Sequence, residues 1–166
     1  DGGLFERLLS EEWSRDFCSL YPSYEEYKAH GLGFAALKEG VPVAGASSYT
    51  FWSEGIEIEI DTRSDCRRKG LATVCASALI LECLRRGLYP SWDAHDLRSL
   101  ALAEKLGYRL EMLYPLQAGL KVLRLVVVAV MVGKLQHIIL LSSLRRLFRL
   151  EGLFARLEGK RLSALT

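Results

Sequence analysis

The stretch from residue 56 to residue 79 constrains the fold more than any other part of the chain. Isoleucines alternate with acidic residues over 56–61, which is the period-two pattern of a strand with one buried face. After Gly70 the apolar positions recur every three or four residues, as on one face of a helix: Leu71, Val74, Cys75, Ala78 and Leu79. This stretch therefore predicts a strand over 56–62, a short connection, and a helix that begins just after Gly70.

The turn that joins this strand to the helix has the composition of an anion-binding site. Arg67, Arg68 and Lys69 directly precede Gly70 at the expected helix N-terminus. The first backbone N–H groups of a helix have no internal acceptor, and the helix dipole adds partial positive charge there. We therefore predict that the turn binds a phosphate or a similar anion. The alternative is a solvated basic turn that binds no ligand.

Charge is distributed unevenly along the 166 residues. Residues 1–114 carry 13 Lys and Arg against 18 Asp and Glu, a net charge of −5, whereas residues 115–166 carry 9 against 2, a net charge of +7. Because half of the chain is hydrophobic, its length suits one domain with a substantial core. We expect a mildly acidic domain over 1–114 and a basic extension over 115–166.

The four cysteines do not show the spacing of a metal site or of a disulfide framework. Cys75 and Cys83 fall on the predicted helix as small core residues, and Cys66 borders the basic turn. We expect reduced cysteines, no metal and, since no signal-peptide pattern opens the chain, a cytoplasmic protein. The chain begins without methionine, as a fragment that lacks the first strand of its fold would.

Helical spacing, capping residues and glycine turns divide residues 1–114 into alternating elements. In chain order we expect helices over 4–19 and 24–30, strands over 34–38, 41–52 and 56–62, a helix over 71–86, a strand over 89–94, a helix over 97–106 and a strand over 108–114. The short turns make the first three strands an antiparallel meander. The helix that follows them requires the next strand to pair in parallel. The fold class is therefore α+β on a mixed sheet.

Several of these blocks resemble the GNAT acyltransferase superfamily. Arg67-x-x-Gly70-x-Ala72 matches the superfamily signature (Gln/Arg)-x-x-Gly-x-(Gly/Ala), in its usual place between a strand and a helix. Further blocks resemble a bacterial branch known simply as GNAT acetyltransferase, over about residues 13–114: 55–62, 69–73, 90–94 and 102–108. The resemblance implies a GNAT-like fold, in which helices flank a mixed, mostly antiparallel sheet.

The same resemblance implies that the chain binds acetyl-CoA as a co-substrate. The backbone N–H groups of the turn would hold the pyrophosphate, and the end of the strand would pair with the pantetheine arm where two strands splay apart. Backbone N–H groups of that strand would also stabilise the oxyanion of acyl transfer. The residues implied in cofactor binding are Ile60, Asp61, Thr62, Arg67, Arg68, Lys69, Gly70, Leu71, Ala72, Thr73 and Asp96.

Transfer of an acyl group to an amine needs a general base. Glu57 and Glu59 lie on the polar face of the central strand, where relatives often place a carboxylate base, and burial there would raise a carboxyl pKa toward neutrality. The alternative for both is a surface carboxylate on a half-exposed strand. His95, near the end of the 89–94 strand, is a further candidate for proton transfer, against the alternative of an incidental surface histidine.

Two positions depart from the pattern of the superfamily. Many members carry Asn where this chain has Asp96, which brings negative charge close to an anionic ligand. Many also use a tyrosine as general acid where this chain has Ala103. Protonation of the leaving thiolate would then fall to water or to another residue.

Residues 115–166 lie outside the resemblance. The valine-rich segment 122–132 is too short to span a membrane and predicts a last strand of the sheet. Apolar residues at helical spacing, interspersed with arginines, predict a basic amphipathic helix after it. One interpretation is a helix that packs on its own domain or is poorly ordered. The alternative is a helix that docks on a partner chain or a membrane surface. No motif supports nucleic acid as its target.

Taken together, these features predict an N-acetyltransferase that moves an acetyl group from acetyl-CoA to a primary amine of a small molecule or peptide, by direct attack in a ternary complex. The alternative is a catalytically weak acyl-CoA-binding module whose basic tail docks on a partner chain or a membrane surface. The sequence does not identify the acceptor or the oligomeric state.

Overall fold

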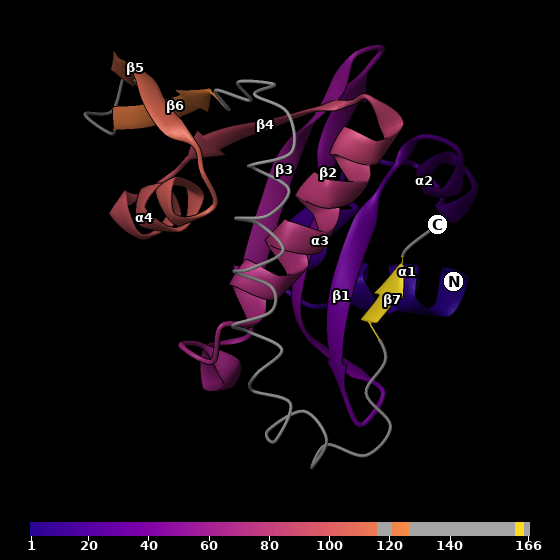
Figure 1. The fold of residues 1–166 in the computed structure, drawn as a ribbon. Coiled ribbons are helices and arrows are strands. Elements are labelled where there is room, and N and C mark those ends of the chain that lie inside the picture. Colours follow the sequence, from indigo (N-terminus) through magenta and orange to yellow (C-terminus); the bar gives the residue numbers. More distant parts are fainter. Residues whose placement is uncertain (116–120, 127–161, 165–166) are drawn as a thin grey trace.

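The computed structural model describes residues 1–115, 121–126 and 162–164. Within these residues the strands form one mixed sheet in the order β5-β6-β4-β3-β2-β1-β7 (Figure 1). In chain order the elements are α1 (Gly2–Ser10), η1 (Arg15–Phe17), α2 (Tyr24–His30), β1 (Gly33–Lys38), β2 (Val41–Trp52), β3 (Gly55–Thr62), η2 (Ser64–Cys66), α3 (Leu71–Arg86), β4 (Tyr89–Ala94), α4 (Leu97–Lys105), β5 (Arg109–Pro115), β6 (Lys121–Val126) and β7 (Leu162–Ala164).

The strand pairings confirm the predicted α+β fold. Strands β1, β2 and β3 form an antiparallel meander, and β4 pairs in parallel with β3 across the α3 crossover. The predicted bounds of α2, β2 and β4 agree with the structure. The pattern over 56–79 predicted β3 and α3 correctly, because the strand and the helix bury their apolar residues against each other on one side of the sheet.

The prediction of a single first helix over 4–19 is wrong, because α1 ends at Ser10. Glu11 adopts an extended conformation, and the short 3-10 helix η1 follows. The buried Ser14 hydroxyl donates to the Leu8 carbonyl oxygen (2.8 Å), so a side chain satisfies a group that a continuing helix would have paired with a backbone N–H. The apolar spacing of this segment did not reveal the break.

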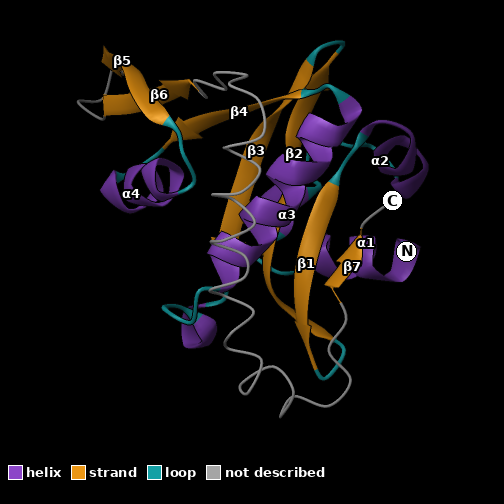
Figure 2. Ribbon diagram, viewed as in Figure 1, coloured by secondary structure: helices purple, strands orange, loops and turns teal. Residues whose placement is uncertain are grey.

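Two helical layers cover the two faces of the sheet (Figure 2). Ala44 and Ala46 of β2 belong to the core that lies under α3, together with the isoleucines of β3. The intervening residues, Gly45 and Ser47, point to the opposite face, where they contact Phe17 and Tyr27. The N-terminal elements α1, η1 and α2 therefore pack on the face of β2 and β3 that is opposite α3.

Aromatic side chains form the core of the N-terminal layer. Phe5, Phe17, Tyr21 and Tyr27 are buried in one cluster, with ring centroids of Tyr21 and Tyr27 4.8 Å apart. Gly45 lets Phe17 approach the sheet, since a Cβ atom there would lie 2.7 Å from the Phe17 ring. This close approach fixes η1 against β2.

Two further strands come from residues beyond 114. Strand β6 pairs with β4 and β5, and β7 pairs with β1. The remainder of the strand predicted over 122–132 and the predicted basic helix lie outside the described residues. In the described part of the chain, no helix is both long enough and apolar enough to cross a lipid bilayer.

The close contact of Phe17 with the sheet makes Gly45 sensitive to substitution. We expect Gly45→Ala to lower the free energy of unfolding by about 1–3 kcal/mol, because the new methyl group overlaps the Phe17 ring. Urea denaturation followed by tryptophan fluorescence measures the change. Gly3→Ala is the matched control: the nearest atom to its Cβ is 3.5 Å away, and alanine favours helix α1. Equal stabilities of the two variants would contradict this packing.

Candidate functional site

The centre of the site is the point where β3 and β4 stop pairing. Their parallel ladder runs from Gly55 opposite Tyr89 to Glu57 opposite Ser91, although β3 continues to Thr62. Beyond the ladder, the Asp93 N–H donates to the Glu57 carboxylate (2.8 Å) instead of to a backbone carbonyl. The sheet thus opens into a gap, with the Glu57 side chain at its apex.

A cavity of about 1050 Å³ occupies this gap. Residues from both faces of the sheet line it, so the cavity reaches from the α3 side to the side of η1. Its lining residues are Asp16, Tyr49, Glu57, Ile58, Glu59, Ile60, Asp61, Thr62, Cys66, Arg67, Arg68, Gly70, Leu71, Ala72, Thr73, Trp92, Asp93, His95, Asp96, Arg98, Ser99, Leu102 and Lys105. All the predicted site residues are among them except Lys69.

The N-terminus of α3 forms one wall of the cavity. Gly70 is its N-cap with φ 78°, and no side chain caps this end of the helix. The Val74 N–H donates to the Gly70 carbonyl oxygen (3.1 Å), so the preceding N–H groups, from Leu71 to Thr73, have no acceptor within the helix. Arg68 also has a positive φ, of 59°. The backbone therefore presents N–H groups and helix-dipole charge to the cavity, as the sequence predicts.

The three basic side chains of this turn do different things. Arg67 folds back to the end of β3, where its Nε donates to the Thr62 carbonyl oxygen (2.9 Å) and its Nη2 lies 3.5 Å from the Asp61 carboxylate. Lys69 turns away and donates to the Asp65 carbonyl oxygen (3.0 Å), which explains its absence from the cavity wall. Arg68 lines the cavity and forms no ion pair with the described residues. Arg68 is therefore the cation available to a ligand.

The end of β3 presents its backbone to the gap. The Arg63 N–H donates to the Val43 carbonyl oxygen (3.0 Å), a bond that makes Ile60 and Thr62 non-hydrogen-bonded positions toward β2. Their backbone groups consequently face the side from which β4 has separated. At Thr62 both groups already have partners, because its N–H donates to the Asp61 carboxylate (2.6 Å) and its carbonyl accepts from Arg67. At Ile60 the backbone N–H bonds to the Glu59 carboxyl, which leaves the Ile60 carbonyl facing the gap.

The two candidate bases occupy different environments on the same face of β3. Glu57 is held by the Asp93 N–H. Burial raises the pKa of Glu59 to about 7, and the negative charge of Asp16 adds to the rise. His95 lies exposed at the rim of the same cavity. Glu59 is therefore the carboxylate suited to exchange a proton near neutral pH.

Asp96 serves as the N-cap of α4. Its carboxylate accepts the N–H groups of Arg98 (2.9 Å) and Ser99 (2.8 Å), and the Arg98 guanidinium pairs with it at 2.6 Å. These bonds lower the pKa of Asp96, the one from Ser99 contributing most. The partnership with Arg98 compensates the negative charge that an aspartate brings to this position. Ala103 is the buried residue on the core-facing side of α4, and it presents no functional group to the cavity.

Sequence reasoning missed several residues of the wall. Arg98 and Lys105 come from α4, Asp16 from η1 and Tyr49 from β2. The spacing of Arg98 and Lys105 on a helix that opens at Asp96 was visible in the sequence and was the available signal. No local pattern could place Asp16 next to β3, because that contact depends on how η1 packs.

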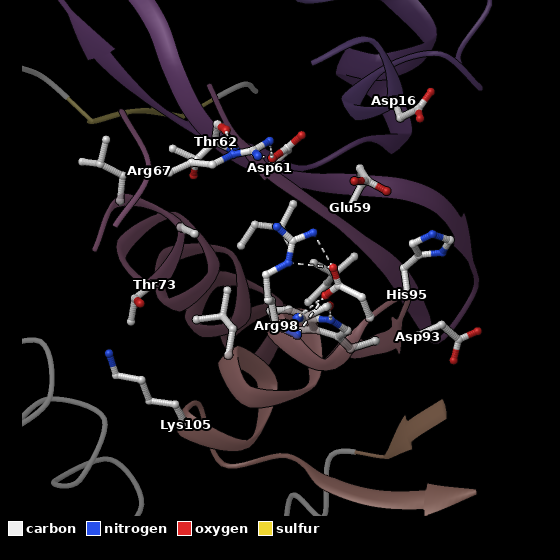
Figure 3. Close-up of a pocket in the computed structure, with 18 of the residues that line it drawn as sticks. Asp16, Glu59, Asp61, Thr62, Arg67, Thr73, Asp93, His95, Arg98 and Lys105 are labelled. Atoms are coloured by element: carbon white, nitrogen blue, oxygen red, sulfur yellow. Dashed lines mark hydrogen bonds and ion pairs between the residues drawn. The ribbon is translucent and has the colours of Figure 1, made fainter. Parts of the chain in front are cut away.

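Charge divides the cavity into two ends (Figure 3). Asp16, Glu59, Asp93 and His95 lie to the right of the view, and Thr73 of the first turn of α3 and Lys105 of α4 lie to the left. The described residues contain no group of three or more His, Cys, Asp or Glu that could hold a metal ion. The arrangement suits a ligand with an anionic part at one end and a second, cationic ligand at the other.

Comparisons with a family model and with a curated relative agree on the family of this chain. Residues 1–116 match the family model described as GNAT acetyltransferase. The uncharacterized N-acetyltransferase YdfB of Bacillus subtilis is 34% identical over an alignment 119 residues long, which covers 64% of this chain and 45% of that protein. The chain thus spans about half the length of this relative.

Two solved structures show the same fold. A GCN5-related N-acetyltransferase-like protein from Streptococcus suis is 52% identical, with a TM-score of 0.67 over 75% of this chain and 48% of that one. The acetyltransferase yncA from Salmonella typhimurium, solved with acetyl-CoA, is 19% identical, with a TM-score of 0.54 over 73% of this chain and 80% of that one. The second likeness concerns the fold alone.

The cap at Asp96 supports the cavity wall formed by α4. We expect Asp96→Ala to lower the free energy of unfolding by about 0.5–2 kcal/mol, because two N–H groups lose their acceptor. Asp96→Asn is the matched control, since an asparagine oxygen also caps a helix, and it should retain most of the stability. Thermal unfolding of both variants tests this. A loss in Asp96→Asn as large as in Asp96→Ala would show that the ion pair with Arg98, and not the cap, matters.

Proposed function

The chain belongs to the GNAT acetyltransferase family, and from that premise we propose that it moves an acetyl group from acetyl-CoA to a primary amine. The observation that carries the proposal is the cavity that passes through the gap between β3 and β4. It brings the anion-binding N-terminus of α3 and the carboxylate Glu59 to opposite ends of one space. Such a space allows two substrates to meet, one from each face of the sheet.

The residues at the α3 end fit the phosphate groups of acetyl-CoA. The unpaired N–H groups after Gly70 and the side chain of Arg68 offer donors and positive charge to a pyrophosphate. Lys105 of α4 adds a second cation on the same wall. The end of β3 at Ile60 would pair with the pantetheine arm through its carbonyl oxygen and lead the thioester toward Glu59. This fit rests on the chain's own geometry.

The carboxylate end fits an amine acceptor. Asp16, Glu59 and Asp93 attract an ammonium group to the side of the cavity opposite the cofactor. Glu59 takes one proton from the ammonium group, and the neutral nitrogen attacks the thioester carbonyl carbon. The carbon–sulfur bond then breaks, and CoA leaves as a thiolate that takes up, directly or through water, the further proton that the new amide nitrogen loses. The pKa of Glu59, near 7, suits this transfer at neutral pH. The acceptor is a small molecule or a peptide with a primary amine.

One observation favours a second candidate function, an acyl-CoA-binding module with little turnover. Ala103 is buried, and the nearby Tyr108 hydroxyl is also buried and donates to the Pro90 carbonyl oxygen (3.0 Å). Neither residue can protonate a leaving thiolate. Release of free thiol from acetyl-CoA across a panel of amines separates the two functions, because a binding module binds acetyl-CoA without releasing thiol. Under this alternative the basic tail docks on a partner chain or a membrane surface.

Gly70 tests the cofactor site. We expect Gly70→Glu to weaken acetyl-CoA binding at least ~100-fold, because a carboxylate would project where the phosphates bind. Isothermal titration calorimetry measures the affinity. Gly40→Glu is the matched control: Gly40 has a similar φ of 79°, lies exposed in the β1–β2 turn and has no atom within 4 Å of its Cβ position. Unchanged affinity in Gly70→Glu would place the cofactor elsewhere.

Glu59 and Glu57 form a matched pair for testing the base. We expect Glu59→Gln to lower kcat about 10²–10⁴-fold in the thiol-release assay, since an amide cannot accept the proton. Glu57→Gln retains an oxygen for the Asp93 N–H and should lower kcat less than about threefold. In the parent protein kcat/KM should rise with pH through a midpoint of about 7 as Glu59 ionises.

Folding provides the control for this pair. Burial that raises the pKa of a carboxyl disfavours its charged form, so the folded state loses stability as pH rises through that pKa. Glu59→Gln should therefore be at least as stable as the parent protein at pH 8, and its loss of activity cannot come from unfolding. Full activity of Glu59→Gln would show that another group is the base.

A further inference from the structure

We propose that Asp16, a cavity-wall residue of η1, sets the pH range in which Glu59 accepts a proton, and that a buried hydrogen bond from Ser47 to the neighbouring Phe17 carbonyl oxygen holds η1 in place. Asp16 would act through Glu59 and is therefore a positioning residue for the base. The inference rests on the proposed function, in which Glu59 is that base. It assigns a role to η1, which no sequence pattern marks as functional.

The register of the sheet places Ser47 beside Glu59. The two residues are partners across β2 and β3. Because the Arg63 N–H donates to the Val43 carbonyl oxygen, alternation along the ladder makes Ser47 and Glu59 a hydrogen-bonded pair. Side chains of such a pair lie on the same face of the sheet. Both therefore point to the face covered by η1.

Ser47 ties η1 to that face. Its hydroxyl donates to the Phe17 carbonyl oxygen (2.7 Å), and the Tyr27 hydroxyl lies 2.6 Å from the same oxygen atom of Ser47. A serine has one hydroxyl proton, so Tyr27 is the donor in the second bond. Both bonds are buried, where an unpaired polar group is costly. The bond to Phe17 therefore holds the η1 backbone at the residue that directly follows Asp16.

Two glycines allow this attachment. A Cβ at Gly33 would lie within contact distance of the Tyr27 hydroxyl, and one at Gly45 would lie 2.7 Å from the Phe17 ring. The absence of side chains at both positions lets Tyr27 and Phe17 pack directly on the strands. The position of η1 over β2 and β3 is therefore fixed by packing and by hydrogen bonds together.

The charges that face Glu59 are unequal in effect. Asp61 is compensated by Arg67, and Glu57 is held by the Asp93 N–H. The Asp16 carboxylate accepts a bond from the neutral Ser19 hydroxyl (3.2 Å) and pairs with no cation among the described residues. The titratable and charged groups around Glu59 on the cavity wall are Asp16 of η1, Tyr49 of β2, Glu57 and Asp61 of β3, Asp93 of β4, His95 after it, and Arg67 and Arg98.

Asp16 is consequently the neighbour whose negative charge is felt most by Glu59. After burial, it is the largest cause of the raised pKa of Glu59, ahead of Asp61 and Glu57. A negative neighbour favours the protonated form of Glu59, so removal of the charge of Asp16 should extend ionisation of Glu59 to lower pH. Structural damage that exposes Glu59 to water would lower its pKa in the same direction, because burial is the largest cause of the rise, so a matched variant that disturbs the sheet away from η1 is the necessary control.

The direct test is a titration of the Glu59 carboxyl carbon by ¹³C NMR, which needs no acceptor. Asp16→Asn keeps an oxygen for the Ser19 hydroxyl but removes the charge, and we expect it to raise the ionised fraction of Glu59 at pH 6 about threefold. The resonance is assigned by its absence in Glu59→Gln. An unchanged titration midpoint in Asp16→Asn would overturn the inference.

A matched pair of serines tests the attachment of η1. Ser47→Ala removes the bond to Phe17, whereas Ser48→Ala removes an equivalent buried pair, with the Tyr21 hydroxyl (2.7 Å) and the Leu32 N–H (2.9 Å). We expect Ser47→Ala, and not Ser48→Ala, to move the titration of Glu59 in the same direction as Asp16→Asn. Equal shifts in both serine variants would show a general effect of sheet damage and would overturn the role of Ser47.

Coupling between the two residues completes the test. If Ser47 acts through Asp16, the double variant Asp16→Asn/Ser47→Ala should titrate like Asp16→Asn alone, and additive shifts would contradict this. Should Ser47→Ala fail to fold, Asp16→Asn still decides the role of the charge. An inactive Glu59→Gln with an unshifted Asp16→Asn refutes this inference alone. A fully active Glu59→Gln refutes the proposed base instead, whatever the NMR midpoints are.

Discussion

The structure depends on the point at which β3 and β4 cease to pair. Backbone groups that lose a sheet partner must find another or stay exposed to solvent or ligand. Here Glu57 supplies that partner to the Asp93 N–H, so the ladder ends in a satisfied bond and the two strands separate beyond it. Through the gap that follows, the cavity described above reaches both faces of the sheet. A carboxylate on the polar face of β3 thus shapes the site.

The two helical layers give the two ends of the cavity charges of opposite sign. The α3 layer contributes a helix N-terminus and basic side chains, and the N-terminal layer contributes Asp16 beside Glu59. Each layer is held by its own core, with Trp92 and the cysteines of α3 in one and Phe17 and Tyr27 in the other. The four cysteines are free and buried, in keeping with small core residues. Substrate charges can therefore be recognised separately at the two ends.

Much of the fold could be predicted because its elements are locally consistent. Period-two alternation in β3, the capping residue Ser23 before α2 and the glycine Gly87 after α3 each act within a single segment and its immediate surroundings. The first helix was mispredicted because its end is not set by a local pattern of apolar residues. Its end at Ser10 depends on a hydrogen bond from Ser14 that competes with helix geometry, and apolar spacing carries no trace of it. Strand β7 was also unexpected, because an edge pairing with β1 is a non-local choice.

The sequence by itself determined the basic turn that leads into the N-terminus of α3. Strand, glycine and helix N-terminus are contiguous there, so backbone geometry alone brings the N–H groups together. Tertiary structure decided which carboxylate suits a base, since the difference between Glu57 and Glu59 arises from burial and from an η1 residue more than 40 positions away. It also decided that Lys69 turns from the cavity while Arg98 and Lys105 line it. A pKa and a cavity wall are sums over contacts from several elements, and no single segment carries them.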